Sequence, residues 1–325
     1  MANQQPPTKK IKLTKKIKIF SSDILVNEIP YEVWRDVICP TLGYSDRLNL
    51  NATCNEFVDT FGDYKQKFLK KHAIHVPQDV RTIEKAMELV AKLQLIPTEK
   101  DPLRIVLDEG VHEIKGDYRK AMRVDESHIT FVGKGKDQTT ILGGFYVVNR
   151  YVERGGICVF IRRNIKFEAL TIMNPDVNGI GLVLDDSTVE VLNCVVKHCW
   201  ATGMSVDGNA TVTATNCEFM ENTMKGVFCG DAKLILNDCQ IHHNGWNGLT
   251  ASRNAVVDIH GTKTDIHANK EYCIYAMRNA WVNIHLPWIR TVGDTQKQVD
   301  GGSVANMNDD GTFTHVMEVE EEHDY

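Results

Sequence analysis

The sequence predicts a mainly β protein whose larger part is a right-handed parallel β-helix. From Leu170 to Ile284 the chain repeats itself every 22 to 25 residues, and each unit holds short alternating apolar runs such as residues 211–214 and 233–236. A unit of this length has room for about three short strands and their turns, and stacked units pair each strand with its copies about 4.8 Å away. The alternative is a β-sandwich, whose strands have no fixed spacing of side-chain type.

Four columns of like side chains define the repeat. One column should face the core: Leu170, Cys194, Cys217, Cys239 and Thr264. An apolar column follows two residues later: Ile172, Val196, Phe219, Ile241 and Ile266. A third column opens the last run of each unit: Ala210, Ala232, Ala255 and Ala280. The fourth is mostly glycine, which we expect to adopt positive φ at a recurring turn: Gly179, Gly203, Gly226, Gly248 and Cys273. Because the total of nine cysteines is odd and some stand in the inward column, we expect packed thiols and no disulfides.

The two ends of the chain carry opposite charge. Lysines and no acids occupy residues 1–19, whereas residues 293–325 carry nine acids against Lys297 alone. We therefore expect a basic disordered tail over residues 1–20 and an acidic flexible tail over residues 293–325. The basic run at residues 7–12 is compatible with a nuclear-import signal and equally with a solvated tail.

The amino-terminal sequence and the lengths of the apolar runs indicate where in the cell the protein is expected. The amino terminus lacks the apolar core of a signal peptide, and no apolar run is long enough to span a bilayer. We therefore expect an intracellular protein, cytoplasmic or nuclear or both, with no membrane partner. The acidic carboxy terminus argues against nucleic acid as the main partner of the folded body.

Residues 21–75 have the pattern of a small helical module. Pro30 suits the first turn of a helix, apolar residues then recur at helical spacing, and Pro40 and Gly43 end the pattern. A second helical stretch is expected from Ser45. The change of period separates this module from the coil that follows.

This module resembles the F-box, a three-helix family, over about residues 22–70. The run IPYEVW at residues 29–34 corresponds to the family's Leu-Pro-x-Glu opening, with Ile29 in place of Leu. The run TCNEF at residues 53–57 corresponds to its Val-Cys-x-x-Trp/Phe segment, with Thr53 in place of Val. An unrelated helical cap remains the alternative.

The β-helix is expected over residues 76–292, beginning with a capping helix. An amphipathic helix should begin in residues 79–87, and residues 105–112 and 129–135 read as strand-turn units. This order is similar to the start of pectin-lyase-like β-helix domains, in which a helix plugs the open end of the coil. A plug is needed because an uncovered end would leave strand edges and core exposed.

An F-box joined to a β-helix resembles the substrate receptors of cullin-RING ubiquitin ligases. That resemblance implies a binding protein without a cofactor, whose F-box docks on a Skp-type adaptor and whose coil holds a target protein of unknown identity. The adaptor contacts implied are an apolar helix face: Ile29, Pro30, Val33, Trp34, Val37 and Ile38. The alternative is that these side chains pack inward or against the coil.

Two competing classes are a carbohydrate-active enzyme and a non-catalytic scaffold. Lyases of the pectin-lyase-like type need carboxylates for Ca²⁺ and a base, and hydrolases need several aspartates near one point. The repeats show no such cluster, and their only paired acid, at Asp185 and Asp186, suits a solvated turn. We therefore expect no lyase or hydrolase activity.

One polar column nevertheless offers candidate chemistry. Five residues before the glycine column, His198, Glu221 and His243 should stack on successive coils about 4.8 Å apart. Two imidazoles flanking a carboxylate suit a metal or acid-base catalysis, but a solvated polar ladder is the preferred reading, with no metal and no catalytic residue. The pairs His242 with His267 and His260 with His285 should be solvated as well.

A ridge of large apolar side chains is expected just before the glycine column. It comprises Trp200, Met224, Trp246 and Tyr272. Side chains of this size at turn tips cannot all reach a narrow interior, and these residue types are enriched in binding hot spots. The ridge is therefore the predicted target-binding surface, unless the apolar segment at residues 313–319 folds back over it.

Overall fold

A computed structural model describes residues 73–92, 97–100, 102–115, 120–148, 150–153, 156–159, 162–286, 297–307 and 312–317. The F-box-like segment with its expected adaptor-binding face, from Ile29 to Ile38, lies outside these residues, as does the basic tail.

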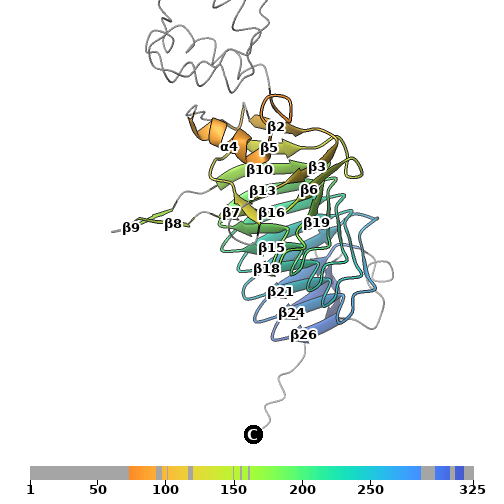
Figure 1. Cartoon of the computed structure of the whole chain (residues 1–325). Coiled ribbons are helices and arrows are strands. Elements are labelled where there is room, and N and C mark those ends of the chain that lie inside the picture. Colours follow the sequence, from red (N-terminus) through yellow and green to blue (C-terminus); the bar gives the residue numbers. More distant parts are fainter. Residues whose placement is uncertain are drawn as a thin grey trace, which may run out of the picture. The chain divides into compact units, whose positions relative to one another are not determined.

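The described chain forms a parallel β-helix whose coils are stacked along one axis (Figure 1). Each central repeat contributes one strand to each of three long sheets. We name the sheets I, II and III. Sheet I contains β1 (Ile74–Val76), β2 (Leu103–Leu107), β5 (Ile129–Val132), β10 (Arg162–Glu168), β13 (Ser187–Leu192), β16 (Thr211–Thr215), β19 (Lys233–Asn237), β22 (Val256–His260), β25 (Trp281–Ile284), β27 (Ser303–Met307) and β28 (Phe313–Met317).

The other two sheets complete each coil. Sheet II contains β3 (Gly110–Glu113), β6 (Thr139–Leu142), β11 (Thr171–Met173), β14 (Val195–Lys197), β17 (Glu218–Met220), β20 (Gln240–His242) and β23 (Asp265–His267). Sheet III contains β4 (Ala121–Arg123), β7 (Gly144–Val148), β12 (Leu182–Asp185), β15 (Met204–Asp207), β18 (Val227–Gly230), β21 (Leu249–Ser252), β24 (Ile274–Met277) and β26 (Lys297–Asp300). A separate antiparallel pair is formed by β8 (Arg150–Glu153) and β9 (Gly156–Val159).

The predicted inward columns form the core. Cys194, Cys217 and Cys239 are buried and free, and the apolar column two residues later is fully buried from Ile172 to Ile266. The strand register stacks Val196 on Phe219 and Phe219 on Ile241, as the repeat requires. The prediction of a mainly β coil is thus confirmed, and the cysteines of the inward column are packed thiols as expected.

Glycine is required in the glycine column for a different reason from the positive φ that was expected. Leu182 pairs with Met204, so Gly181 and not Gly179 stands in line with Gly203. These glycines do not have positive φ. A Cβ at Gly203 would instead lie 2.7 Å from the Gly226 carbonyl oxygen, and one at Gly226 would lie 2.9 Å from that of Gly248. Glycine is needed because each coil approaches the next too closely for a side chain.

Positive φ occurs at other columns, where the coil turns. One column of left-handed residues contains His198, Glu221, His243 and Ala268, with φ between 49° and 55°. A second, between sheets I and II, contains Asn193, Asn216 and Asp238. A left-handed turn bends the backbone sharply after each short strand, and asparagine and aspartate tolerate it better than most residues.

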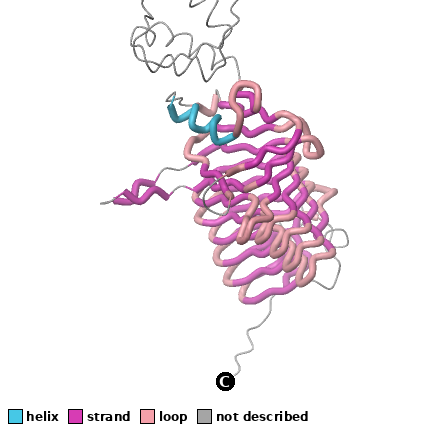
Figure 2. The backbone as a smooth tube through the Cα atoms, viewed as in Figure 1, coloured by secondary structure: helices cyan, strands magenta, loops and turns pink. Residues whose placement is uncertain are grey.

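A helix lies at the amino-terminal end of the coil (Figure 2). This helix, α4 (Ile83–Lys92), begins after Thr82, whose Oγ1 accepts a hydrogen bond from the Lys85 amide at 3.3 Å. Ile83, Ala86 and Val90 are buried, and the opposite face is polar. The expected amphipathic helix is present, and its place in the fold suits a cap.

The coil is longer than the sequence indicated. β1 already pairs with β2 before residue 77, and β26 and β27 continue sheets III and I beyond residue 293, where an acidic tail was expected. The last strand, β28, pairs antiparallel with β27 at the end of sheet I. Residues 313–317 therefore extend sheet I and do not cover the ridge that was expected near the glycine column.

Candidate functional site at one corner of the coil

The most distinctive surface lies where sheet II turns into sheet III. Four successive connections form it, at residues 198–203, 221–226, 243–248 and 268–273, and we call them the corner loops. Each corner loop begins with a left-handed residue and ends at the column occupied by Gly203, Gly226, Gly248 and Cys273. The sharp bend presents the first side chain of each loop at the junction of the two sheets.

The second residue of three corner loops points into the coil and forms an asparagine ladder of Asn222, Asn244 and Asn269. All three are buried. The Nδ2 of Asn222 donates to Asn244 Oδ1 at 3.0 Å, and the Nδ2 of Asn244 donates to Asn269 Oδ1 at 2.9 Å. Backbone amides of neighbouring loops donate to the same oxygens, so the ladder satisfies polar groups that the bends would leave unpaired.

The predicted column of His198, Glu221 and His243 is divided by the structure. His198 Nε2 lies 3.4 Å from Glu221 Oε2, and both side chains are nearly half exposed. No ion pair joins Glu221 to His243 among the described residues. His243 instead directs its Nδ1 to the Nδ1 of His242, at 2.8 Å.

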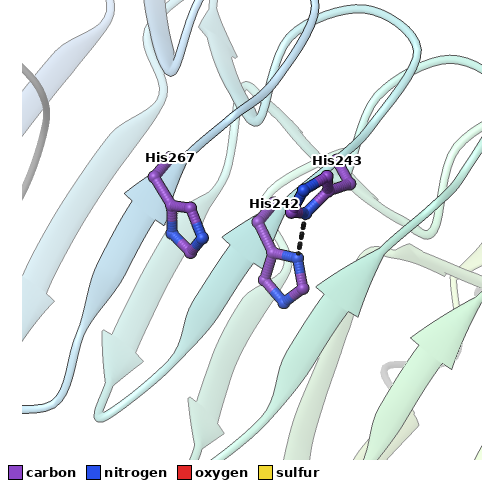
Figure 3. Close-up of side chains that lie close together, drawn as sticks. All are labelled: His242, His243 and His267. Atoms are coloured by element: carbon purple, nitrogen blue, oxygen red, sulfur yellow. Dashed lines mark hydrogen bonds between the residues drawn. The ribbon is translucent and has the colours of Figure 1, made fainter.

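A histidine cluster therefore forms beside that column (Figure 3), and it consists of His242, His243 and His267. One ligand nitrogen from each lies within 4.8 Å of the other two. His242 is only 9% exposed, so the expected solvated pair of His242 and His267 is corrected to a partly buried, stacked pair with ring centroids 5.0 Å apart.

Two carboxylates flank this cluster. Glu218 Oε1, on the neighbouring strand β17, lies 2.9 Å from His242 Nε2. Asp265 Oδ2 lies 3.1 Å from His267 Nδ1. Lys136 Nζ lies 4.0 Å from Glu218 Oε2 and is a cation close to this carboxylate. Glu218 was missed in the sequence, although it precedes the inward residue Phe219 and so had to face outward.

A second histidine pair lies on sheet I, away from the corner. The rings of His260 and His285 stack with centroids 4.0 Å apart, and His285 Nε2 lies 3.4 Å from Asp258 Oδ1. Partial burial, and then the neighbouring His285, lower the pKa of His260. This pair is therefore half-buried, whereas we expected it to be solvated.

The expected ridge is exposed in part. Trp200 and Trp246 are 39% and 43% exposed, while Met224 and Tyr272 are half-buried. Trp200 is the third residue of its corner loop, Met224 and Trp246 are the fourth, and Tyr272 is the fifth, so the four do not form one straight column. Met224 and Trp246 are level, because the Trp246 amide donates to the Met224 carbonyl at 2.8 Å.

A lysine lies among these aromatic groups. Lys225 Nζ is 4.9 Å from the ring centroid of Phe228 and 5.9 Å from that of Trp246. Burial lowers the pKa of Lys225. The ridge is therefore an aromatic surface beside one lysine, and tryptophan and tyrosine are residue types enriched at protein-binding hot spots.

Two acids at the end of neighbouring sheet III strands form ion pairs with one arginine. Arg253 Nη2 lies 2.6 Å from Asp207 Oδ2, and Arg253 Nε lies 2.7 Å from Asp231 Oδ2. These carboxylates are consequently engaged in ion pairs on the outer face.

The comparisons define the class of protein. Residues 112–233 and 155–307 match the family described as the right handed beta helix region, which spans more than half of the chain, so the protein belongs to this family. A search of curated proteins found no match. No helix in the described part of the chain is long and apolar enough to cross a membrane.

Solved structures with similar coils are distant. Geobacillus virus E2 ORF18 is 11% identical with a TM-score of 0.41, over 79% of this chain and 65% of that one. The Agl-KA catalytic domain is 15% identical with a TM-score of 0.45, over 72% of this chain and 48% of that one. Pectate lyase Pel9A is 12% identical with a TM-score of 0.39, over 73% of this chain and 78% of that one. The chain spans less than two thirds of the first two proteins.

Proposed function

We propose that this protein is the substrate-recognition subunit of a cullin-RING ubiquitin ligase. In this proposal the F-box-like segment binds a Skp-type adaptor, and the coil binds the target protein. The observation that carries it is the combination, in one chain, of the signature runs at residues 29–34 and 53–57 with a β-helix that exposes Trp200 and Trp246.

The geometry of the coil supports a binding role. A parallel β-helix holds its corner loops at a fixed spacing, because the strands that flank these loops pair with their counterparts on adjacent coils. Tryptophan and tyrosine on such a support lose little conformational entropy on binding, because each has only two side-chain torsions. The protein would then act by holding a target at one edge, with no chemical step of its own.

Adaptor capture by the purified chain tests this proposal. The untagged adaptor should copurify with the full chain and with the control Trp281→Ala, which alters an exposed tryptophan on sheet I away from the corner. It should be lost when Val33→Asp and Ile38→Asp place charges on the expected apolar face. A chain lacking residues 1–72, which keeps all of β1, should also fail to capture it. Equal capture by this shortened chain would overturn the proposal.

A second candidate is a carbohydrate-active enzyme, and the observation that favours it is the pair of Glu218 and His242 on an outer face. We expect no release of unsaturated or reducing ends from polygalacturonate, with or without Ca²⁺. Release that is abolished by Glu221→Gln or Glu218→Gln would instead establish this enzyme class.

A further inference from the structure

We propose that His242, His243 and His267 form a Zn²⁺-binding site, with Glu218 orienting His242. The three imidazoles come from β20, the following corner loop and β23, so two adjacent coils supply them. In Figure 3 the ring of His243 faces that of His242, and a ring nitrogen of His267 points toward His242. This site is independent of the proposed function.

The hydrogen bonds fix the state of His242. Its Nε2 lies 2.9 Å from the Glu218 carboxylate, which accepts only, so Nε2 carries a proton. In the neutral ring Nδ1 is then unprotonated and has a free lone pair. This nitrogen faces His243 Nδ1 at 2.8 Å, so without a metal a proton must lie between them. A metal ion can take the place of that proton.

The arrangement of Glu218 and His242 is one that metal sites use. A ligating histidine usually donates its other ring N–H to a carboxylate or carbonyl, which fixes the ring and raises its basicity. Asp265 Oδ2, 3.1 Å from His267 Nδ1, stands in a similar relation to the third histidine. His267 Nδ1 is buried and has no aligned hydrogen-bond partner within the described residues, so it lies beside Asp265 without a hydrogen bond in the present ring orientation.

A tetrahedral centre requires two adjustments of the three histidines. Zn–N bonds of about 2.0–2.1 Å place two ligand nitrogens about 3.3 Å apart. The pair at 2.8 Å must open slightly, and the nitrogen of His267, which lies within 4.8 Å of the other two, must approach by up to about 1.5 Å. The rings of His242 and His267 are stacked at 16°, so this approach requires rotation of His267. Its side chain is 43% exposed and has room to rotate.

The three ligand nitrogens indicate which class of metal ion the site would bind. Three imidazoles suit Zn²⁺ and neighbouring transition ions, whereas Ca²⁺ and Mg²⁺ prefer oxygen. Three protein ligands also leave the fourth tetrahedral position to water or to a group from another molecule. Glu218 and Asp265 offset part of the ion's charge.

Calorimetric titration of the untagged, metal-stripped full chain with Zn²⁺ alone tests the site. We expect one Zn²⁺ per chain and no response to Ca²⁺. His243→Ala and His267→Ala should each weaken binding by at least about 10-fold, and Glu218→Gln by about 10- to 100-fold. Ala268, at the column of His243 with φ of 49°, shows that alanine fits this turn.

The matched control is His260→Ala, which removes one ring of the other stacked histidine pair. It should leave Zn²⁺ affinity unchanged, and circular dichroism should show every variant folded. Absence of Zn²⁺ binding by the wild-type chain would overturn the inference. So would equal affinity in the wild type and in a folded His243→Ala, His267→Ala double variant.

Discussion

Replacing Asn244 by alanine tests the asparagine ladder. Its Oδ1 accepts from the backbone amide and the Nδ2 of Asn222, and the two hydrogens of its Nδ2 are shared among the carbonyl oxygens of Phe219 and His242 and Asn269 Oδ1. All of these contacts lie inside the coil, where water cannot replace them.

The expected cost follows from these contacts. The Asn222 amide loses its acceptor, and a buried unsatisfied donor costs about 1–3 kcal/mol. Asn222 Nδ2 keeps a bond to the Val196 carbonyl, so its loss is partial. Adding the net value of the remaining bonds, about 0.5–1.5 kcal/mol each, we expect Asn244→Ala to lower the free energy of unfolding by about 3–5 kcal/mol.

Urea unfolding followed by circular dichroism measures this change, and amide hydrogen exchange locates it. Exchange at the Asn222 amide should accelerate most. The control Asn254→Ala removes one exposed hydrogen bond, to Asp231 Oδ1 at 3.1 Å, and should change stability by at most about 0.5 kcal/mol. If both variants lose the same small amount, the ladder does not stabilise the coil as described.

Three further predictions concern packing, ionisation and binding. Gly226→Ala should cost about 1–3 kcal/mol in urea unfolding, because its Cβ would lie 2.6 Å from Ile241 Cγ2; a neutral result would contradict the close-approach explanation. Burial raises the pKa values of Cys194, Cys199 and Cys229 to about 12. Their unfolded pKa is about 8.5, so the unfolded chain loses protons first and stability should fall as pH rises from about 9 toward 12, by up to about 1.4 kcal/mol per thiol per unit. Flat urea midpoints over that range would refute this. Trp200→Ala and Trp246→Ala should each weaken target binding by about 2 kcal/mol or more in calorimetry, without a change in circular dichroism. A misfolded double variant would instead assign these side chains to the core.

The coil could be predicted because the same inward chemistry recurs in every unit. A repeated Cys194, Cys217 and Cys239 position has one simple explanation, a shared interior. The reason for the glycine column could not be read in the same way. Positive φ and close approach of two coils both favour glycine, so the residue type alone does not tell which of the two applies.

The asparagine ladder could have been predicted from the sequence, because its three residues recur at equivalent positions. Asn222, Asn244 and Asn269 recur with the repeat, directly after the left-handed column. Asparagine at a turn is usually assigned to solvent, because its side chain favours turns for local reasons. Here the bend directs it inward, where the neighbouring loops provide both donors and acceptors.

The histidine cluster was harder to predict. His243 belongs to the corner loop and His242 to the preceding strand. The two residues therefore fall in different columns of the repeat, and an alignment of equivalent positions does not bring them together. Their contact depends on the left-handed φ of 55° at His243, which turns its ring back toward the strand. The carboxy-terminal strands were missed because the acidic residues around them resemble a solvated tail.

The proposed receptor role requires the F-box-like segment and the ridge to bind different proteins independently. Quantitative affinity purification should compare the wild type, Val33→Asp with Ile38→Asp, and Trp200→Ala with Trp246→Ala. We predict that the first variant loses the Skp-type adaptor and keeps the bound target, whereas the second keeps the adaptor and loses the target. Loss of both proteins in either folded variant, or retention of both in each, would contradict the account.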